Sequence, residues 1–169
     1  MNRELQIRDV SLMKTICAQC NEDFTCHSFN FVGHTLEGGA IFYTKITNAS
    51  KYDDTKGITE HCKNYLNYMN PVKWSWIIDF EGFSLKHTLG VNTGIQLAKL
   101  INTYGKLHQL IMINTNLFVD QMLTMIKFVL DKKYHQCIQT IHSRVNLLHK
   151  FQEWLPINEQ SLHSLHLLV

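Results

Sequence analysis

The stretch of residues 74–130 constrains the fold more than any other part of the chain. An apolar run over residues 74–78 ends at Asp79, and a second run over residues 110–113 ends at Asn114. A segment with helical spacing lies between them. Short apolar runs rich in β-branched and aromatic residues, separated by a helix, are typical of buried parallel strands in a βαβ unit. The stretch therefore predicts an α/β fold, with ligands at the carboxyl ends of its strands.

The segments on either side of this stretch supply the rest of a sheet and its covering helices. Residues 29–34 and 40–46 flank a glycine-containing turn and predict a β-hairpin. Residues 53–69 predict a helix that ends before Pro71, because the residue preceding proline disfavours helix. An apolar stripe on this helix at helical spacing predicts burial. Its members are Ile58, Cys62, Tyr65, Leu66 and Met69.

Together these elements predict a mixed, largely parallel sheet flanked by helices. The last strand is expected over residues 138–141 and a further helix over residues 145–154. We expect one domain of 169 residues, because a chain of this length buries enough surface for a single core. Within it, residues 1–28 form an N-terminal helical cover, residues 29–156 the core, and residues 157–169 a short C-terminal tail.

The predicted helix over residues 117–130 is apolar on most of its surface. Its polar side chains Asp120, Thr124 and Lys127 form one narrow stripe. Such a helix has more apolar surface than a single contact with a sheet can cover. It is either buried between the sheet and its neighbours or lies over an apolar cavity. Trp76 and Ile78 are likewise either core residues of the sheet or part of that cavity.

Composition and charge exclude several classes of protein. With 45% apolar and 18% charged residues the chain is a packed globule, and a formal charge of +2 gives no support for nucleic-acid binding. The longest apolar segment is too short to span a bilayer. The first four residues, Met-Asn-Arg-Glu, lack the apolar core of a secretory signal peptide. The sequence therefore predicts a cytoplasmic protein.

The five cysteines do not form a complete disulfide framework, because their number is odd. Cys17 and Cys20 have the spacing of half a zinc site, and Cys26, His27 and His34 follow nearby. A structural zinc ion is one hypothesis. No second pair of ligands with typical spacing follows, so the sequence favours reduced thiols and no metal.

Asp79 and Glu81 are the best candidates for catalytic acids. At the end of a strand, residues i and i+2 lie on the same side, which would suit a pair of acids. General acid–base catalysis also requires a nucleophile or an electrophilic partner, and the neighbouring sequence offers none. We therefore expect a protein that is not an enzyme.

The order of these motifs resembles the CRAL-TRIO lipid-binding domain family. The resemblance is carried by residues 78–84 (Ile-Asp-Phe-Glu-Gly-Phe-Ser), Tyr104, residues 111–114 and residues 127–131, and extends from about Phe31 to Pro156. The chain is similar to the compact, divergent branch that lacks the family's N-terminal helical bundle. The family's tyrosine–proline–glutamate–arginine motif is absent after Tyr104, and Cys137 stands where a lysine is expected. The resemblance therefore does not extend to recognition of phosphatidylinositol.

The resemblance implies that residues 117–130 form a mobile gate helix over a hydrophobic cavity. The implied function is non-enzymatic binding or transfer of a lipid or other small hydrophobic ligand. The residues expected to line the cavity and gate are Trp76, Ile78, Phe80, Ile113, Phe118, Met122, Met125, Ile126 and Val129. No metal and no cofactor besides a bound lipid are expected, and the protein would contact membrane surfaces peripherally and transiently. The alternative is a protein-interaction module that binds a partner or small GTPase without a resident lipid.

Overall fold

The structure is a computed structural model that describes residues 16–84, 87, 91–142, 147–155 and 157–168. Most of the N-terminal helical cover expected over residues 1–28 lies outside the described residues. Within that segment the structure contains the short helix α2 (Ala18–Glu22).

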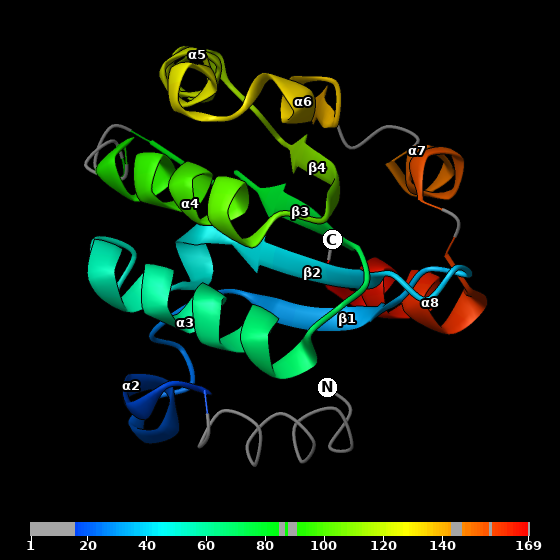
Figure 1. The fold of residues 1–169 in the computed structure, drawn as a ribbon, viewed down its shortest axis with the longest axis horizontal. Coiled ribbons are helices and arrows are strands. Elements are labelled where there is room, and N and C mark those ends of the chain that lie inside the picture. Colours follow the sequence, from blue (N-terminus) through cyan, green and yellow to red (C-terminus); the bar gives the residue numbers. More distant parts are fainter. Residues whose placement is uncertain (1–15, 85–86, 88–90, 143–146, 156, 169) are drawn as a thin grey trace.

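A five-stranded sheet runs through the centre of the molecule in the order β1-β2-β3-β4-β5 (Figure 1). Its strands are β1 (Asn30–His34), β2 (Ala40–Lys45), β3 (Trp74–Asp79), β4 (Leu107–Ile113) and β5 (Ile138–Ile141). Strands β1 and β2 pair antiparallel, whereas β2 to β5 are all parallel. The predicted hairpin and the predicted mixed, largely parallel α/β sheet are confirmed.

Helices cover both faces of this sheet. The helices that connect parallel strands lie on one face, because consecutive crossovers in one direction place their helices on the same side. They are α3 (Thr55–Met69), α4 (Val91–Tyr104) and α5 (Leu117–Val129). The opposite face packs against α7 (Leu147–Trp154) and α8 (Glu159–Leu168). The turn η1 (Ile46–Asn48) follows β2, and α6 (Lys132–His135) precedes β5.

The helices begin and end where the local sequence satisfies their terminal backbone groups. Asp54 caps α3 by accepting a hydrogen bond from the amide of Gly57, and Asn70 ends the helix in the left-handed conformation with φ of 38°. Asn116 caps α5 by accepting from two backbone amides, those of Phe118 and Val119. These caps place α5 directly after the carboxyl end of β4.

Strand alternation divides the interior into two apolar clusters. Trp74 and Trp76 of β3 face α3, α4 and α5, whereas Ile77, the residue after Trp76, faces α7 and α8. The first cluster is rich in large aromatic rings, and Phe29, Phe42 and Trp76 stack or meet edge to face within it. The second cluster consists mainly of isoleucine and leucine. The two faces of one sheet therefore have different compositions.

Candidate functional site: an apolar cavity between the sheet and three helices

A cavity of about 120 Å³ lies between the sheet and the three helices α3, α4 and α5. Its floor is the aromatic face of the sheet. Three neighbouring strands form this floor, through Thr44 of β2, Trp76 and Ile78 of β3, and Leu110 and Met112 of β4. Because these strands are parallel and in register, the side chains that face the helices form one continuous apolar surface.

The helices supply the walls of the cavity. Helix α3 contributes Ile58 and Cys62. Helix α4 contributes a row of apolar or small side chains, and α5 contributes three more. These are Gly94, Leu97, Ala98 and Ile101 of α4, and Met122, Leu123 and Ile126 of α5. Phe80, Phe83 and His87 close the end that lies beyond the carboxyl terminus of β3.

Helices α4 and α5 approach each other closely where they border the cavity. A Cβ atom at Gly94 would lie 2.6 Å from Cδ1 of Ile126 and 3.2 Å from its Cγ1. Real Cβ atoms do not approach other atoms this closely. Glycine at position 94 therefore allows the Ile126 side chain to lie against α4.

Polar atoms at the cavity wall are bonded to one another. The indole Nε1 of Trp76 donates to the hydroxyl of Thr44 at 2.9 Å, and the hydroxyls of Thr55 and Thr93 are 2.7 Å apart. Burial raises the pKa of the Cys62 thiol, which therefore stays protonated and behaves as a small apolar group. The cavity thus offers an occupant apolar contacts and few free hydrogen-bonding groups.

Five of the nine residues expected at the ligand site line this cavity. They are Trp76, Ile78, Phe80, Met122 and Ile126. Val129 is partly buried against the same apolar cluster without lining the cavity. Phe118 and Met125 lie on the outer side of α5 and are 40% and 45% exposed.

Ile113 lies on the other face of the sheet, in the cluster with Ile77. The reason is the register between β3 and β4. Ile78 pairs with Met112, so Met112 shares the cavity face, whereas Ile113 pairs with Asp79 and points away. The sequence prediction therefore chose the right strand but the wrong residue of it: Met112, and not Ile113, lines the cavity.

The sequence interpretation missed the contributions of α3 and α4 to the wall. Ile58 and Cys62 were recognised as an apolar stripe, which correctly predicted burial and gave no sign of a cavity beside them. In α4, Gly94 and Ala98 are four residues apart on one helical face. Two small residues at this spacing indicate that another helix packs closely against this face, or that space beside it is left unfilled.

Asp79 at the carboxyl end of β3 is fully buried, and both oxygens of its carboxylate accept hydrogen bonds. Its carboxylate accepts from the hydroxyl of Tyr43 at 2.9 Å, from Nδ2 of Asn114 at 2.7 Å, and from the amide of Glu81 at 2.8 Å. The ammonium group of Lys45 lies 4.0 Å away and bonds to Glu81. These bonds hold the ends of three strands together. Asp79 therefore has a structural role at the carboxyl edge of the sheet.

A cluster of four possible metal ligands, two thiols and two imidazoles, lies outside the cavity, between α2 and α3. Cys17, Cys20, His27 and His61 meet there, and their ligand atoms all lie within 4.8 Å of one another. Burial raises the pKa of the Cys20 thiol to about 12 and lowers the pKa of His61 to about 4. Among the described residues, this is the group whose side chains could hold a metal ion.

No protein-family model matches the chain, and no curated protein matches its sequence. The fold is similar to the crystal structure of Sfh5, with a TM-score of 0.57 and 10% sequence identity. The match covers 77% of this chain and 52% of Sfh5, so the chain corresponds to about half the length of that protein. At this identity the similarity concerns the fold alone. It supports the α/β fold described above, a largely parallel sheet flanked by helices.

Proposed function

We propose that this protein binds a small hydrophobic ligand, such as part of a lipid, in the cavity beneath α4 and α5, and that it is not an enzyme. The observation that carries the proposal is the apolar cavity between the sheet and three helices. Close-packed interiors contain few voids larger than a water molecule. A space of about 120 Å³ with an apolar wall is therefore suited to an apolar occupant.

The volume of the cavity limits what it holds in this conformation. An apolar cavity of about 150 Å³ stays dry and accepts a molecule the size of benzene. The cavity here, at about 120 Å³, suits a few methylene groups or one small ring. Each buried methylene contributes about 0.8 kcal/mol to affinity. A longer acyl chain requires one wall to move.

Helix α5 is the wall that we propose to move, as a gate. Side-chain hydrogen bonds hold it near its two ends. At its amino end Asn116 donates to the carbonyl of Phe83 at 3.2 Å. At its carboxyl end Asn102 donates to the carbonyl of Val129 at 2.9 Å, and Nε2 of His135 lies 3.0 Å from the carbonyl oxygen of Lys127. Between these points α5 meets the cavity through Met122, whose flexible side chain repacks easily around different ligands.

The outer face of α5 suits contact with a lipid surface. Four large apolar side chains are exposed along it, with Lys127 exposed nearby. They are Leu117, Phe118, Met125 and Phe128, of which Phe128 is 87% exposed. They fall on one side of the helix at its 3.6-residue period. A helix that closes a hydrophobic cavity and presents an apolar outer face would let a ligand pass between bilayer and cavity. No helix in the described parts of the chain is long and apolar enough to cross a membrane.

Native mass spectrometry of the protein purified from cells tests the proposal. We expect an additional mass that corresponds to a hydrophobic small molecule or lipid. Met122→Trp, which fills the cavity, should remove that mass and reduce uptake of a fluorescent fatty acid. Met125→Trp is the matched control, because Met125 lies three residues away on the outer face of α5. Equal loss in both variants, or no uptake by the unchanged protein, would contradict a ligand in this cavity.

Co-flotation with liposomes tests the membrane contact. Phe118→Asp should sharply weaken association with both neutral and anionic vesicles, whereas moderate salt should have little effect, because the net charge is only +2. Leu66→Ala, buried in α3, is the control for loss of stability alone. Binding that salt abolishes and that Phe118→Asp leaves unchanged would refute insertion of α5.

A protein-interaction module is the second candidate function. The exposed apolar face of α5 favours it, because such a face also suits a protein partner. The same mass spectrum separates the two candidates. A protein that carries no hydrophobic ligand and takes up none, yet needs Phe118 and Phe128 for its interactions, would be such a module.

A further inference from the structure

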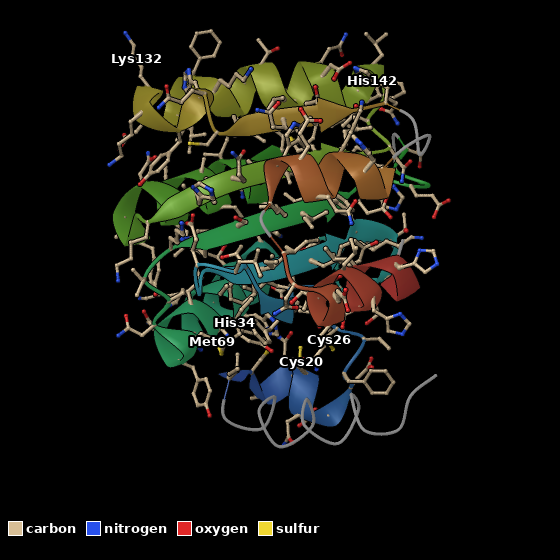
Figure 2. The ribbon with its side chains drawn as sticks, turned by 90° about the vertical axis from the view of Figure 1, so that its right-hand side faces the viewer. Cys20, Cys26, His34, Met69, Lys132 and His142 are labelled. Carbon is tan, nitrogen blue, oxygen red and sulfur yellow. The ribbon has the colours of Figure 1, made fainter. Side chains whose placement is uncertain are left out.

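We propose that Cys17, Cys20, His27 and His61 bind one structural zinc ion. The four residues come from three separate places in the chain. Cys17 and Cys20 flank the start of α2, His27 precedes β1, and His61 lies in the middle of α3. Figure 2 shows Cys20 where α2 faces the rest of the molecule. Folding thus brings together two thiols and two imidazoles, which is the ligand set of many structural zinc sites.

Three sulfur–nitrogen distances in the cluster match those of a tetrahedral zinc site. Nδ1 of His27 lies 3.5 Å from Sγ of Cys17 and 3.4 Å from Sγ of Cys20, and Nδ1 of His61 lies 3.6 Å from Sγ of Cys20. With Zn–S bonds of about 2.3 Å and Zn–N bonds of about 2.05 Å, tetrahedral geometry puts sulfur and nitrogen about 3.6 Å apart. The four side chains need little movement to hold the ion.

The outer nitrogen of His61 is bonded in the way that a zinc-binding histidine requires. Its Nε2 lies 3.3 Å from the carbonyl oxygen of Phe29. A carbonyl only accepts, so Nε2 carries the proton and Nδ1 presents its lone pair to the cluster. An outer-shell partner of this kind fixes both the tautomer and the orientation of the ring.

His27 has a carboxylate on its outer side. Its Nε2 is 4.0 Å from Oδ2 of Asp54, and within the described residues this buried nitrogen has no partner at hydrogen-bond distance. Asp54 is itself held by the amide of Gly57 at 2.8 Å and by Nε2 of Gln19 at 3.1 Å. A Cβ atom at Gly57 would lie 2.9 Å from Nε2 of His27. The glycine therefore leaves space for the ring beside α3.

The site is buried and closed by protein ligands. Cys20, His27 and His61 are each at most 3% exposed, and Cys17 is half-buried. Four protein ligands leave no open position for water or substrate, which is typical of a structural and not of a catalytic zinc ion. Zinc also suits this mixed sulfur and nitrogen set better than the hard cations Mg²⁺ and Ca²⁺.

The ion would connect the N-terminal segment to the body of the fold beside the cavity. Ser28 and Cys62, the neighbours in sequence of His27 and His61, both line the cavity wall. Metal binding at the cluster would therefore hold α2, the start of β1 and α3 in a fixed arrangement. This function does not depend on whether the cavity holds a ligand.

The sequence favoured no metal because it shows a single Cys-x-x-Cys pair and no second pair. The two histidines are 34 positions apart and come together only through the packing of α3 against the segment before β1. Of the other residues considered near the pair, Cys26 turns its thiol toward the carbonyl of Gln19 at 3.7 Å, and His34 is exposed on β1. Neither belongs to the cluster.

Elemental analysis of the purified protein is the first test. We expect one zinc per chain. Cys20→Ser and His61→Asn should each lower the zinc content to well below one, whereas Cys26→Ser and Cys137→Ser should keep it. Loss of zinc with Cys26→Ser and retention with Cys20→Ser would overturn the ligand assignment.

A titration of the unchanged protein avoids dependence on variants that fail to fold. After zinc is removed with a chelator, Co²⁺ should bind with the visible and near-ultraviolet absorption of a four-coordinate thiolate site. Zinc should displace Co²⁺ and restore the melting temperature that the chelator lowered. A metal-free protein whose melting temperature is unaffected by chelator and by zinc, and which gives no such spectrum, refutes the site.

Asp54→Asn tests the outer-shell role of the carboxylate. Asparagine caps a helix about as well as aspartate, so α3 should remain intact. Loss of an outer-shell partner typically weakens metal binding by about 10- to 100-fold. We expect a decrease of that size in competition with a chromophoric chelator. Unchanged zinc affinity would show that Asp54 only caps the helix.

Discussion

The two faces of the central sheet differ in how completely they are packed. On one face, side chains from β2, β3 and β4 meet α3, α4 and α5 around a cavity. On the other face, residues of the same strands meet α7 and α8 in a cluster whose core members are all at most 5% exposed. Adjacent residues of one strand, such as Trp76 and Ile77, thus lie in different environments.

The comparison shows that the space on the first face is a local property and not a general looseness of the fold. Isoleucine and leucine fill the second face, whereas the first combines large rings such as Trp76 with the small residues Gly94 and Ala98 around the cavity. Rigid rings beside small side chains leave gaps that branched aliphatic residues would fill. The packed face supports the sheet, which leaves the other face free to hold a ligand.

Phe151→Ala should give the largest loss of stability. Phe151 is fully buried in the packed cluster, and truncation of such a ring costs about 3–5 kcal/mol. Urea unfolding followed by circular dichroism should show this decrease, with ligand uptake by the remaining folded protein unchanged. Phe128→Ala is the control, because Phe128 is 87% exposed and its loss should change stability by at most about 0.5 kcal/mol. A cost below about 1 kcal/mol for Phe151→Ala would show that the second face is also loosely packed.

Asp79→Ala should also lower the stability, through lost hydrogen bonds and not through lost packing. The change removes the acceptor of three hydrogen bonds, those from Tyr43, Asn114 and the amide of Glu81, at a buried position. We expect a loss of about 2–3 kcal/mol in the free energy of unfolding. Asp79→Asn keeps an acceptor oxygen and should cost less. If the two variants lose equal stability, the charge of Asp79 matters more than its hydrogen bonds.

A matched pair of leucine truncations compares the two faces directly. Leu155→Ala on the packed face should cost about 4 kcal/mol, and Leu123→Ala at the cavity about 2 kcal/mol. The difference arises because a side chain that borders a void has fewer contacts to lose. Chemical denaturation gives both values, and Leu123→Ala should also admit a bulkier fluorescent ligand. Equal costs would contradict the difference in packing.

Sequence alone predicted the sheet and most of its helices because their signals are local. The runs at residues 74–78 and 110–113, the turn at Gly38 and Gly39, and the helix stop at Pro71 each depend on neighbouring residues. The predicted strand over residues 138–141 matches β5. These elements were fixed by hydrophobic spacing and by backbone preferences.

The cavity and the metal cluster were harder to predict because both depend on contacts between distant segments. The helical period of α5 did not show which side faces inward, so Phe118 and Met125 were grouped with Met122 and Ile126. The register of β4 against β3 decided the place of Ile113. The approach of His61 to Cys20 required the packing of α3, which no local pattern encodes.

Gly94→Ala should have the smallest effect on stability of these changes, and it tests how closely the cavity face is packed. Alanine favours a helix over glycine by about 1 kcal/mol, but its Cβ would lie 2.6 Å from Cδ1 of Ile126. Because the end of the Ile126 side chain borders the cavity, it has room to rotate away. We therefore expect the free energy of unfolding to change by less than about 1 kcal/mol, while the cavity shrinks and ligand uptake falls.

The double variant with Ile126→Val tests the contact, because valine lacks the clashing Cδ1. The free energy of unfolding of the double variant should exceed the value expected from adding the two single changes by about 0.5 kcal/mol or more. A cost above about 2 kcal/mol for Gly94→Ala would mean that the Ile126 side chain has no space into which it can rotate. The face of the sheet with the cavity would then be packed as closely as the opposite face.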